Sequence, residues 1–391
     1  MITNSIIMPV YNNEAYVSES LSAFMHLDPS CTEIIIVDDC STDRSIAIIN
    51  SIVGDRPNTR LIKNSRNLGA ARALKEGIKE SRGKYLYCAA ADDISSLSRI
   101  ERCEAIFDSN PKVGIIVSNA TVINEKSRVT GETYAIDSFV TNDNIAINQF
   151  KRNYCLGATM AIRSNKEILL KEGMLEESDD YQISLEYLLS DFDIHIIREE
   201  LVRYRIHSTN LSGDYLENFR KTQKMTLQYD VEEIKSLLLN KGFQEKEVYV
   251  SSGIFELFRG NLEQGYKFLK LANDIKSANS AVAYENLFYL GVCSYLYHDL
   301  DSCIDYFESA YSIHSEEPTV QNNLGVCYLE SNGDVSKSLA WIENSLLIEP
   351  NYIDALNNRD QLITHENEKR MKLTQRILSQ KILKRPTNYL G

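Results

Sequence analysis

The sequence predicts an α/β domain with a mostly parallel sheet, followed by an all-α domain of repeated helical pairs. Short apolar runs alternate with amphipathic helical patterns up to about Gly213. Strand signals vanish beyond that point, and helical periodicity with an internal repeat follows. Alternation of short strands with helices is typical of a parallel sheet with helices on both faces. We predict an α/β domain at 1–213, a helical linker at 214–249, repeats at 250–365 and a basic C-terminal helix or tail at 366–391.

The elements of the first domain follow from apolar runs bounded by turn residues. The predicted strands are Ile6–Val10, Ile34–Val37, Leu61–Ile62, Tyr85–Cys88 and Val113–Val117. The predicted helices are Glu14–Met25, Asp43–Ile52, Gly69–Lys79 and Leu97–Phe107. In such sheets, ligands bind beyond the carboxyl ends of the strands. Because Tyr11, Asp39 and Asp92 all follow strand ends, we expect them to share one site.

The second domain carries a repeat of helical units. Leu290-Gly291 and Leu324-Gly325 lie 34 residues apart, which is the period of a tetratricopeptide repeat. Phe307 and Ile342 occupy matching bulky positions, and a looser unit can be built around Gly253. Small residues at these places would let two helices of a pair approach closely. A helical bundle with accidental similarity is the alternative.

Composition narrows the class of protein. The formal net charge of −13 argues against nucleic-acid binding, which needs a basic face. The 8 cysteines are scattered without a C-x-x-C pair, which is typical of reduced thiols in a cytosolic chain. No signal-like segment or membrane-spanning run is evident, so we expect a cytoplasmic protein.

The final segment, EKRMKLTQRILSQKILKRP, is basic on one face, and Met371, Leu378 and Ile382 can share another. Such a helix could contact the anionic inner face of the cell membrane. A solvated helix that caps the repeats is the equal alternative.

Two adjacent carboxylates, Asp92 and Asp93, end the apolar run in KYLYCAAADDIS. Such a pair can hold a divalent metal against a diphosphate, although Asp-Asp pairs are also common in turns and helix caps. Three further segments favour the functional interpretation, because they surround the pair in a fixed order: MPVYNN, VDDCSTD and ESDDYQISLEY.

With these motifs, the first domain resembles the GT-A fold of family 2 glycosyltransferases. The resemblance implies that Pro9 ends the first strand and that Tyr11 lies along a nucleotide base. It implies that Asp39 accepts a hydrogen bond from the imide N–H of uracil. In NLGAARALKEGI, it implies further donor-binding residues at the start of a helix, where Arg72 contacts the base edge or a phosphate; these are Asn67, Gly69 and Arg72.

The same resemblance implies a metal and a base. Asp92 and Asp93, with His207 of YRIH, would bind Mn²⁺ or Mg²⁺, although Ala90 stands where the family usually has a first carboxylate. A phosphate oxygen is the alternative ligand of His207. Asp92 would thereby also contact the donor, and Arg205 would help to neutralise the departing diphosphate. Asp180 matches the base that takes the proton from the acceptor hydroxyl, and a helix cap is the alternative role.

The resemblance therefore implies inverting transfer from a nucleotide sugar, most simply a UDP-sugar, to a hydroxyl. Because helical repeats offer an extended face for polypeptides, we predict a Ser or Thr acceptor in a protein, an arrangement that resembles bacterial flagellin-modifying enzymes. Exposed repeat faces could also pair in a homodimer. The first alternative is a transferase that builds a cell-surface polysaccharide on a lipid-linked acceptor. The second is a non-catalytic scaffold with a decayed transferase domain, for which Ala90 is the best support.

Overall fold

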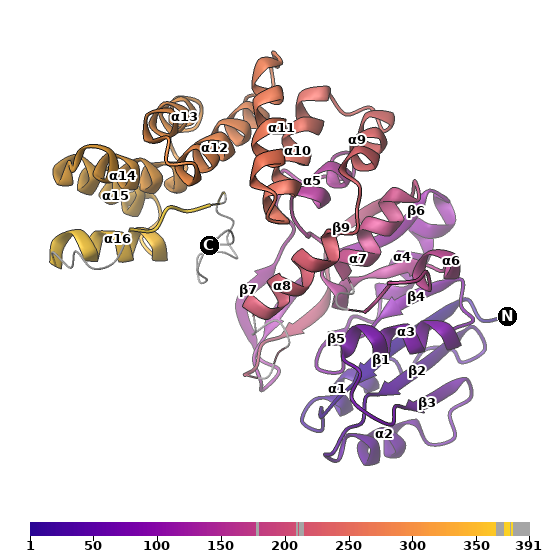
Figure 1. The fold of residues 1–391 in the computed structure, drawn as a ribbon. Coiled ribbons are helices and arrows are strands. Elements are labelled where there is room, and N and C mark those ends of the chain that lie inside the picture. The colour runs from indigo at the N-terminus through magenta and orange to yellow at the C-terminus, as the bar shows by residue number, and fades with distance from the viewer. Residues whose placement is uncertain (177–179, 209, 211–214, 365–370, 376, 378–391) are drawn as a thin grey trace. The chain divides into compact units, whose positions relative to one another are not determined.

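The computed structural model describes the chain except for residues 177–179, 209, 211–214, 365–370, 376 and 378–391 (Figure 1). The chain forms two compact units, Met1–Tyr229 and Asp230–Gly391. Helix α8 (Tyr215–Thr226), which follows the predicted end of the α/β domain, packs on α7 (Asp180–Leu189) and belongs to the first unit.

The first unit is built on a mixed sheet in the order β3-β2-β1-β4-β8-β6-β9-β5, with β7 paired to β6, counted over the described residues. Strands β1 to β4 run parallel to one another, whereas β8 runs antiparallel to both β4 and β6. Because β8 opposes both β4 and β6, β6 runs in the same direction as β4, and β9 is parallel to β6. The sheet is therefore mostly parallel, with β5, β7 and β8 running in the opposite direction. The strands are β1 Asn4–Val10, β2 Thr32–Asp38, β3 Thr59–Lys63, β4 Tyr85–Cys88, β5 Ile94–Ser95, β6 Val113–Ile123, β7 Val129–Tyr134, β8 Ala161–Arg163 and β9 Asp193–Arg205.

Helices cover this sheet on both faces (Figure 1). Besides α7 and α8, the helices of the first unit are α1 Val17–Ser22, α2 Ser45–Val53, α3 Ala70–Glu80, α4 Arg99–Ser109, α5 Ile145–Lys151 and α6 Lys166–Leu169, with a 3-10 helix at Gly157–Thr159. The helices of the second unit are α9 Val231–Asn240, α10 Glu245–Phe258, α11 Leu262–Asp274, α12 Ser280–Leu296, α13 Leu300–Ile313, α14 Pro318–Asn332, α15 Val335–Ile348 and α16 Ile353–Thr364.

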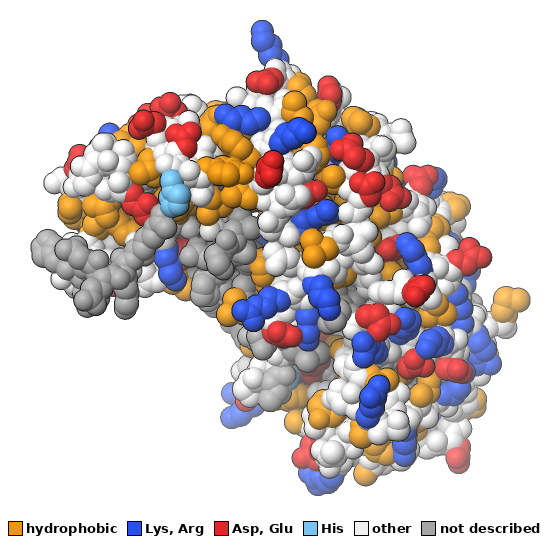
Figure 2. Space-filling view, in the orientation of Figure 1, with side chains coloured by type: hydrophobic (Ala, Val, Ile, Leu, Met, Phe, Trp, Pro, Cys, Tyr) orange, Lys and Arg blue, Asp and Glu red, His pale blue; other side chains and the backbone are white. Residues whose placement is uncertain are grey.

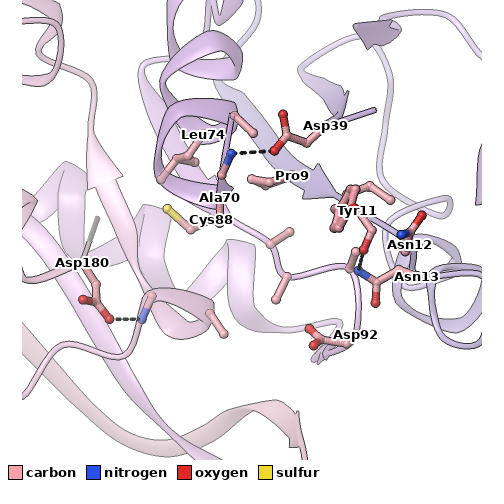
Figure 3. A pocket seen from close by; sticks show the side chains of 18 of the residues that line it. Pro9, Tyr11, Asn12, Asn13, Asp39, Ala70, Leu74, Cys88, Asp92 and Asp180 are labelled. Carbon is pink, nitrogen blue, oxygen red and sulfur yellow. Dashed lines mark hydrogen bonds between the residues drawn. The ribbon is translucent and has the colours of Figure 1, made fainter. Parts of the chain in front are cut away.

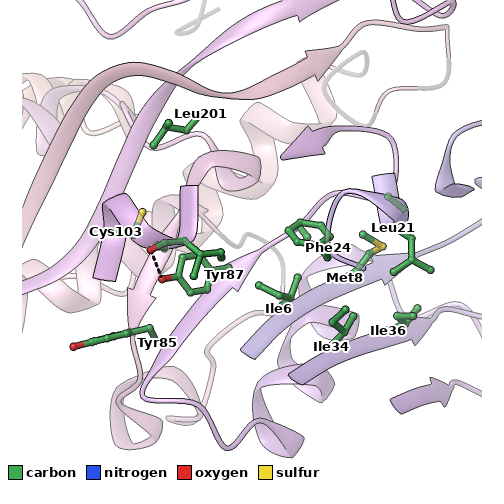
Figure 4. Close-up of a cluster of buried hydrophobic side chains, with 14 of the residues drawn as sticks. Ile6, Met8, Leu21, Phe24, Ile34, Ile36, Tyr85, Tyr87, Cys103 and Leu201 are labelled. Carbon is green, nitrogen blue, oxygen red and sulfur yellow. Dashed lines mark hydrogen bonds between the residues drawn. The ribbon is translucent and has the colours of Figure 1, made fainter. Parts of the chain in front are cut away.

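The alternation of side chains between the two sheet faces explains why the run Ile34–Val37 of β2 is apolar at every position. Ile34 and Ile36 join the large core cluster shown in Figure 4, whereas Ile35 and Val37 face Ala73 of α3. A strand that is buried on both faces shows a continuous apolar run rather than an alternating one. Asp39, the residue that follows β2, therefore lies at the carboxyl end of this buried strand and is itself buried.

At the opposite end of the same strand, the buried carboxylate of Glu33 joins β2 to neighbouring segments. Glu33 is fully buried and accepts hydrogen bonds from Ser5 Oγ and the Arg82 backbone N–H, both at 2.6 Å. It also pairs with Arg60 at 2.9 Å. Burial opposes its charge, but the hydrogen bonds from Ser5 and Arg82 and the charge of Arg60 hold the pKa of Glu33 below its ordinary value.

We expect Glu33→Gln to lower the free energy of unfolding at neutral pH by about 1–3 kcal/mol, because buried donors lose a charged acceptor. A carboxyl whose pKa is lowered by folding stabilises only while it is ionised. The wild-type advantage should be present above the ordinary glutamate pKa and vanish as the pH falls through the folded-state pKa. Urea unfolding of both chains, followed by circular dichroism down through the acid range, tests this. A stability difference that does not change with pH would contradict it.

The second unit stacks antiparallel helix pairs, α10 with α11, α12 with α13 and α14 with α15. A Cβ on Gly291 would lie 2.8 Å from the Phe307 ring, and a Cβ on Gly325 would lie 2.7 Å from Ile342 Cγ1. Both distances are shorter than real Cβ contacts, so only glycine allows these helices to approach so closely. The predicted pairing of small and bulky positions is confirmed at both places.

The predicted basic helix at the C-terminus is not found in its described part. Residues 371–375 are not helical, and Met371 is buried, so it does not belong to a surface helix. Leu378 and Ile382 lie outside the described residues.

Within the described part of the chain, no helix is both long and apolar enough to span a membrane. Acidic and basic side chains are interspersed on the face in Figure 2.

Candidate active site

A cavity of about 590 Å³ lies at the carboxyl ends of β1, β2 and β4 (Figure 3). Eight of the residues predicted for the site line it: Pro9, Tyr11, Asp39, Asn67, Gly69, Asp92, Asp180 and His207. They come from segments as distant in sequence as β1 and α7. The prediction that these segments share one site is thus supported by the geometry.

Pro9 and Tyr11 form the wall next to β1. Pro9 lies within β1 rather than at its end, and it pairs there with Val37 of β2. The pairing of β1 with β4 has already ended at Ile7, so β1 continues as far as Val10 beside β2 alone. Tyr11 follows with an exposed ring that faces the cavity (Figure 3). It is well placed to cover a flat ligand group.

Asp39 is almost fully buried and organises the loop before α3. Its carboxylate accepts hydrogen bonds from the backbone N–H groups of Leu68 at 2.9 Å and Gly69 at 2.8 Å, and from Asn64 Nδ2 at 2.8 Å. Asp39 therefore fixes the loop as well as lining the cavity. The predicted contact with uracil remains a prediction.

The loop reaches α3 through Gly69, whose φ of 89° is unfavourable for any residue with a side chain. Asn67 Oδ1 also accepts the Gly69 N–H, at 3.0 Å. The N-terminus of α3 therefore opens onto the cavity with backbone rather than side chains next to it. A helix N-terminus whose backbone a ligand can approach closely favours a negatively charged ligand.

Asp92 and His207 meet at the cavity, with 2.9 Å between Asp92 Oδ2 and His207 Nε2. The ring of Tyr16 packs against His207 with 4.7 Å between centroids. One carboxylate oxygen and one imidazole nitrogen suit Mn²⁺ or Mg²⁺ only if a ligand supplies the other oxygens. Consistently, no group of three or more acidic, histidine or cysteine residues able to hold a metal occurs among the described residues.

Asp93 does not line the cavity, in contrast to the prediction that it binds the metal beside Asp92. It is 5% exposed, and its Oδ1 accepts the backbone N–H of Arg205 at 2.7 Å. Burial, followed by the charge of Asp92, raises the pKa of Asp93. The structure therefore favours Asp92 with His207 over the adjacent acid pair.

The two arginines predicted to contact the donor do not reach the cavity. Arg205 is fully buried, and its guanidinium binds the Asp92 carbonyl at 2.6 Å and Glu19 at 2.8 Å. It therefore positions Asp92 instead of contacting a diphosphate. Arg72 is held by Glu176 at 2.8 Å on the surface.

Asp180 begins α7 on another side of the cavity from Asp92 (Figure 3). Its Oδ2 accepts the Gly157 N–H at 3.1 Å, and its Oδ1 accepts Asn153 Nδ2 at 3.1 Å. Both donors and the helix N-terminus stabilise the ionised carboxylate, which is the form that a base needs. Asp179, the other acid of the predicted pair, lies outside the described residues.

Sequence reasoning missed a buried residue beneath the cavity. Arg99 is 1% exposed and donates to the carbonyls of Cys88 at 3.1 Å and Met160 at 2.8 Å, two residues of the cavity wall. Arg99 is the first residue of α4, and nothing in the sequence around it indicated that this charged side chain would be buried. Asn12, Asn13, Ala70, Leu74 and Ile183 also line the cavity and were not predicted.

Comparisons with known proteins agree with this geometry. Residues 5–178 match the family model described as glycosyl transferase family 2. An uncharacterized glycosyltransferase of Haemophilus influenzae is 26% identical over an alignment of 279 residues, and the match covers 68% of this chain and 83% of the relative. The poly-beta-1,6-N-acetyl-D-glucosamine synthase of Staphylococcus epidermidis is 27% identical over 199 residues, and the match covers 49% of this chain and 47% of the synthase.

Among solved structures, S. aureus TarS 1–349 in complex with UDP-GlcNAc has a TM-score of 0.51 at 14% identity, and the match covers 90% of this chain and 92% of that one. The mixed sheet and this likeness define the first unit as a GT-A transferase fold. The family match at residues 5–178 lies within that unit and supports a family 2 glycosyltransferase domain there.

Proposed function

We propose that the protein transfers a sugar, with inversion, from a nucleotide sugar to an acceptor hydroxyl. The observation that carries the proposal is that Asp180 and Asp92 reach one cavity from separate elements (Figure 3). A base and a charge-stabilising group on separate sides of a sugar are what in-line displacement at C1 requires. The TarS complex, which contains UDP-GlcNAc, supports a UDP-sugar as donor.

Tyr11 and Asp39 would hold the nucleotide, and the N-terminus of α3 would lie near its phosphates. Asp92 and His207 would hold Mn²⁺ or Mg²⁺, which, when bound, neutralises the charge of the departing diphosphate. Arg205 keeps the Asp92 backbone in place through its bond to the carbonyl. Asp180 Oδ2 or Oδ1 would take the acceptor proton as the hydroxyl oxygen attacks.

We propose a protein acceptor, with Ser or Thr hydroxyls, because the second unit stacks helix pairs of tetratricopeptide period. Such stacks present an extended face to polypeptides. The second candidate is transfer to a growing cell-surface polysaccharide on a lipid carrier, which the likeness to the poly-N-acetylglucosamine synthase favours.

A thermal-shift screen of the full chain with nucleotide sugars, each with and without Mn²⁺, tests the donor. We expect a UDP-sugar to raise the melting temperature, because a ligand that binds only the folded state stabilises it. Incubation of the best donor, labelled in its sugar, with protein and with lipid-linked acceptors then separates the two candidates. No stabilisation by any nucleotide sugar, with or without metal, would overturn the proposal.

A further inference from the structure

A segment near the C-terminus is held by side-chain amides of the second unit. Asn323 of α14 donates from Nδ2 to the carbonyl of Thr374 and accepts the Thr374 N–H at Oδ1, both at 2.8 Å. One carboxamide thus satisfies both backbone groups of one residue, as a neighbouring β-strand would. Such a contact recognises main chain and does not depend on the side chain of the residue held.

The same pairing recurs two residues earlier, from another helix. Asn358 of α16 accepts the Lys372 N–H at 2.7 Å and donates to the Lys372 carbonyl at 2.8 Å. Asn322 links the two, since its Oδ1 accepts from Asn358 Nδ2 at 2.9 Å. The segment 371–375, part of the yellow trace in Figure 1, is therefore gripped through the main chain at alternate residues.

Side-chain positions along the segment differ in chemistry. Met371 and Leu373 are buried in the apolar cluster of α12 to α16, at 7% and 3% exposure. Thr374 is also buried, and its hydroxyl lies 3.0 Å from Asp354 Oδ2. The face thus accepts an extended chain with apolar residues two apart, followed by a hydroxyl residue.

The three asparagines of this face are fully buried. Buried amides are costly unless they are hydrogen-bonded, so the face needs an occupant that supplies main-chain N–H and C=O groups. Because four of the contacts that hold Lys372 and Thr374 go to main chain, other extended chains of similar apolar pattern meet the same requirement.

We propose that the face formed by Asn322, Asn323 and Asn358, here called the asparagine groove, binds an extended segment of the acceptor protein. Residues 371–375 occupy the groove as a built-in competitor that the acceptor displaces. The inference rests on the proposed protein acceptor and names the surface that would hold it. The expected ligand is an unfolded or loop polypeptide with the pattern apolar-x-apolar-Ser/Thr.

The test uses the full chain with Met371→Asp and Leu373→Asp, which should release the segment and leave the groove intact. The probe is a fluorescent synthetic peptide with the sequence of residues 371–377, followed by fluorescence anisotropy. We expect the released chain to bind it at least tenfold more tightly than the wild type, whose own segment competes at the high effective concentration of a tethered ligand.

Asn323→Ala in the released chain should then weaken peptide binding at least tenfold, because one residue of the peptide loses both main-chain partners. Asn332→Ala is the matched control, since Asn332 lies exposed at the end of the same helix. Failure of the released chain to bind, or equal binding after Asn323→Ala, would show that the segment is only a fixed part of the fold.

If the released chain loses its helical circular dichroism, the unmodified chain answers the same question by hydrogen exchange. Millimolar peptide should then speed exchange at the amides of Lys372 and Thr374, and unchanged exchange would overturn the groove. Failures of the two proposals are distinguishable. Peptide binding without sugar transfer to any protein contradicts the acceptor, whereas protein transfer without peptide binding contradicts the groove alone.

Discussion

Asp180→Asn should lower the rate of sugar transfer by about 10²–10⁴-fold while leaving UDP affinity nearly unchanged. Asparagine keeps the size of the side chain and an oxygen that can accept from the Gly157 N–H, but it cannot take up a proton. The acceptor hydroxyl then attacks without a base. The cavity wall next to the nucleotide is formed by other elements, so donor binding should survive. Transfer kinetics and calorimetric titration with UDP measure the two effects.

Asp191→Asn is the matched control for this substitution. Asp191 follows the C-terminal end of α7 and pairs with Lys112 on the surface. It should alter neither the transfer rate nor the UDP affinity. If Asp180→Asn reduced UDP affinity in proportion to the rate, Asp180 would belong to the donor side and the base would have to be sought elsewhere.

The first half of the sheet could be predicted because its strands contain short apolar runs. A strand such as β2, which is buried on both faces, appears in the sequence as a continuous apolar run with turn residues on either side. Among the later strands, β6 was predicted from its apolar run Val113–Val117, whereas β8 and β9 gave no such signal. β8 has 3 residues, and β9 carries exposed charged residues at 198–200, where its pairing with β6 changes register. Both are held by neighbours distant in sequence, which local patterns do not reveal.

The same limit applied to the site. The candidate carboxylates were found because the order of their motifs along the chain is visible, and Asp92 and Asp180 do line the cavity. The direction of a long side chain depends on tertiary contacts instead. Arg205 is the last residue of β9, in a motif that suggested a diphosphate contact, but Glu19, far away in sequence, holds its guanidinium inside the domain.

The asparagine groove illustrates a signal that was present but not used. Asn-Asn pairs occur at 322–323 and 357–358, each on the first helix after a turn. Of these four asparagines, Asn322, Asn323 and Asn358 are buried on one face, whereas Asn357 is exposed. Buried asparagines without a partner are costly, so such a recurrence predicts a main-chain ligand.

Asp92→Asn should reduce the metal-dependent part of UDP affinity at least about tenfold, because the site loses its charged oxygen ligand. Affinity for UDP without metal should change little, since Tyr11 and the α3 N-terminus remain. Calorimetric titration with UDP, with and without Mn²⁺, separates the two parts. The His207 ring would keep its packing on Tyr16, so the fold should be retained.

Asp93→Asn decides between the two possible ligand sets. Its side chain is buried and accepts the Arg205 N–H, and the asparagine oxygen can accept the same bond. If Asp92 and His207 hold the metal, this variant should keep the metal-dependent gain in UDP affinity that Asp92→Asn loses. The opposite pattern, loss at Asp93 and retention at Asp92, would mean that Asp93 turns towards the cavity when the metal binds. The adjacent acid pair predicted from the sequence would then be the metal site.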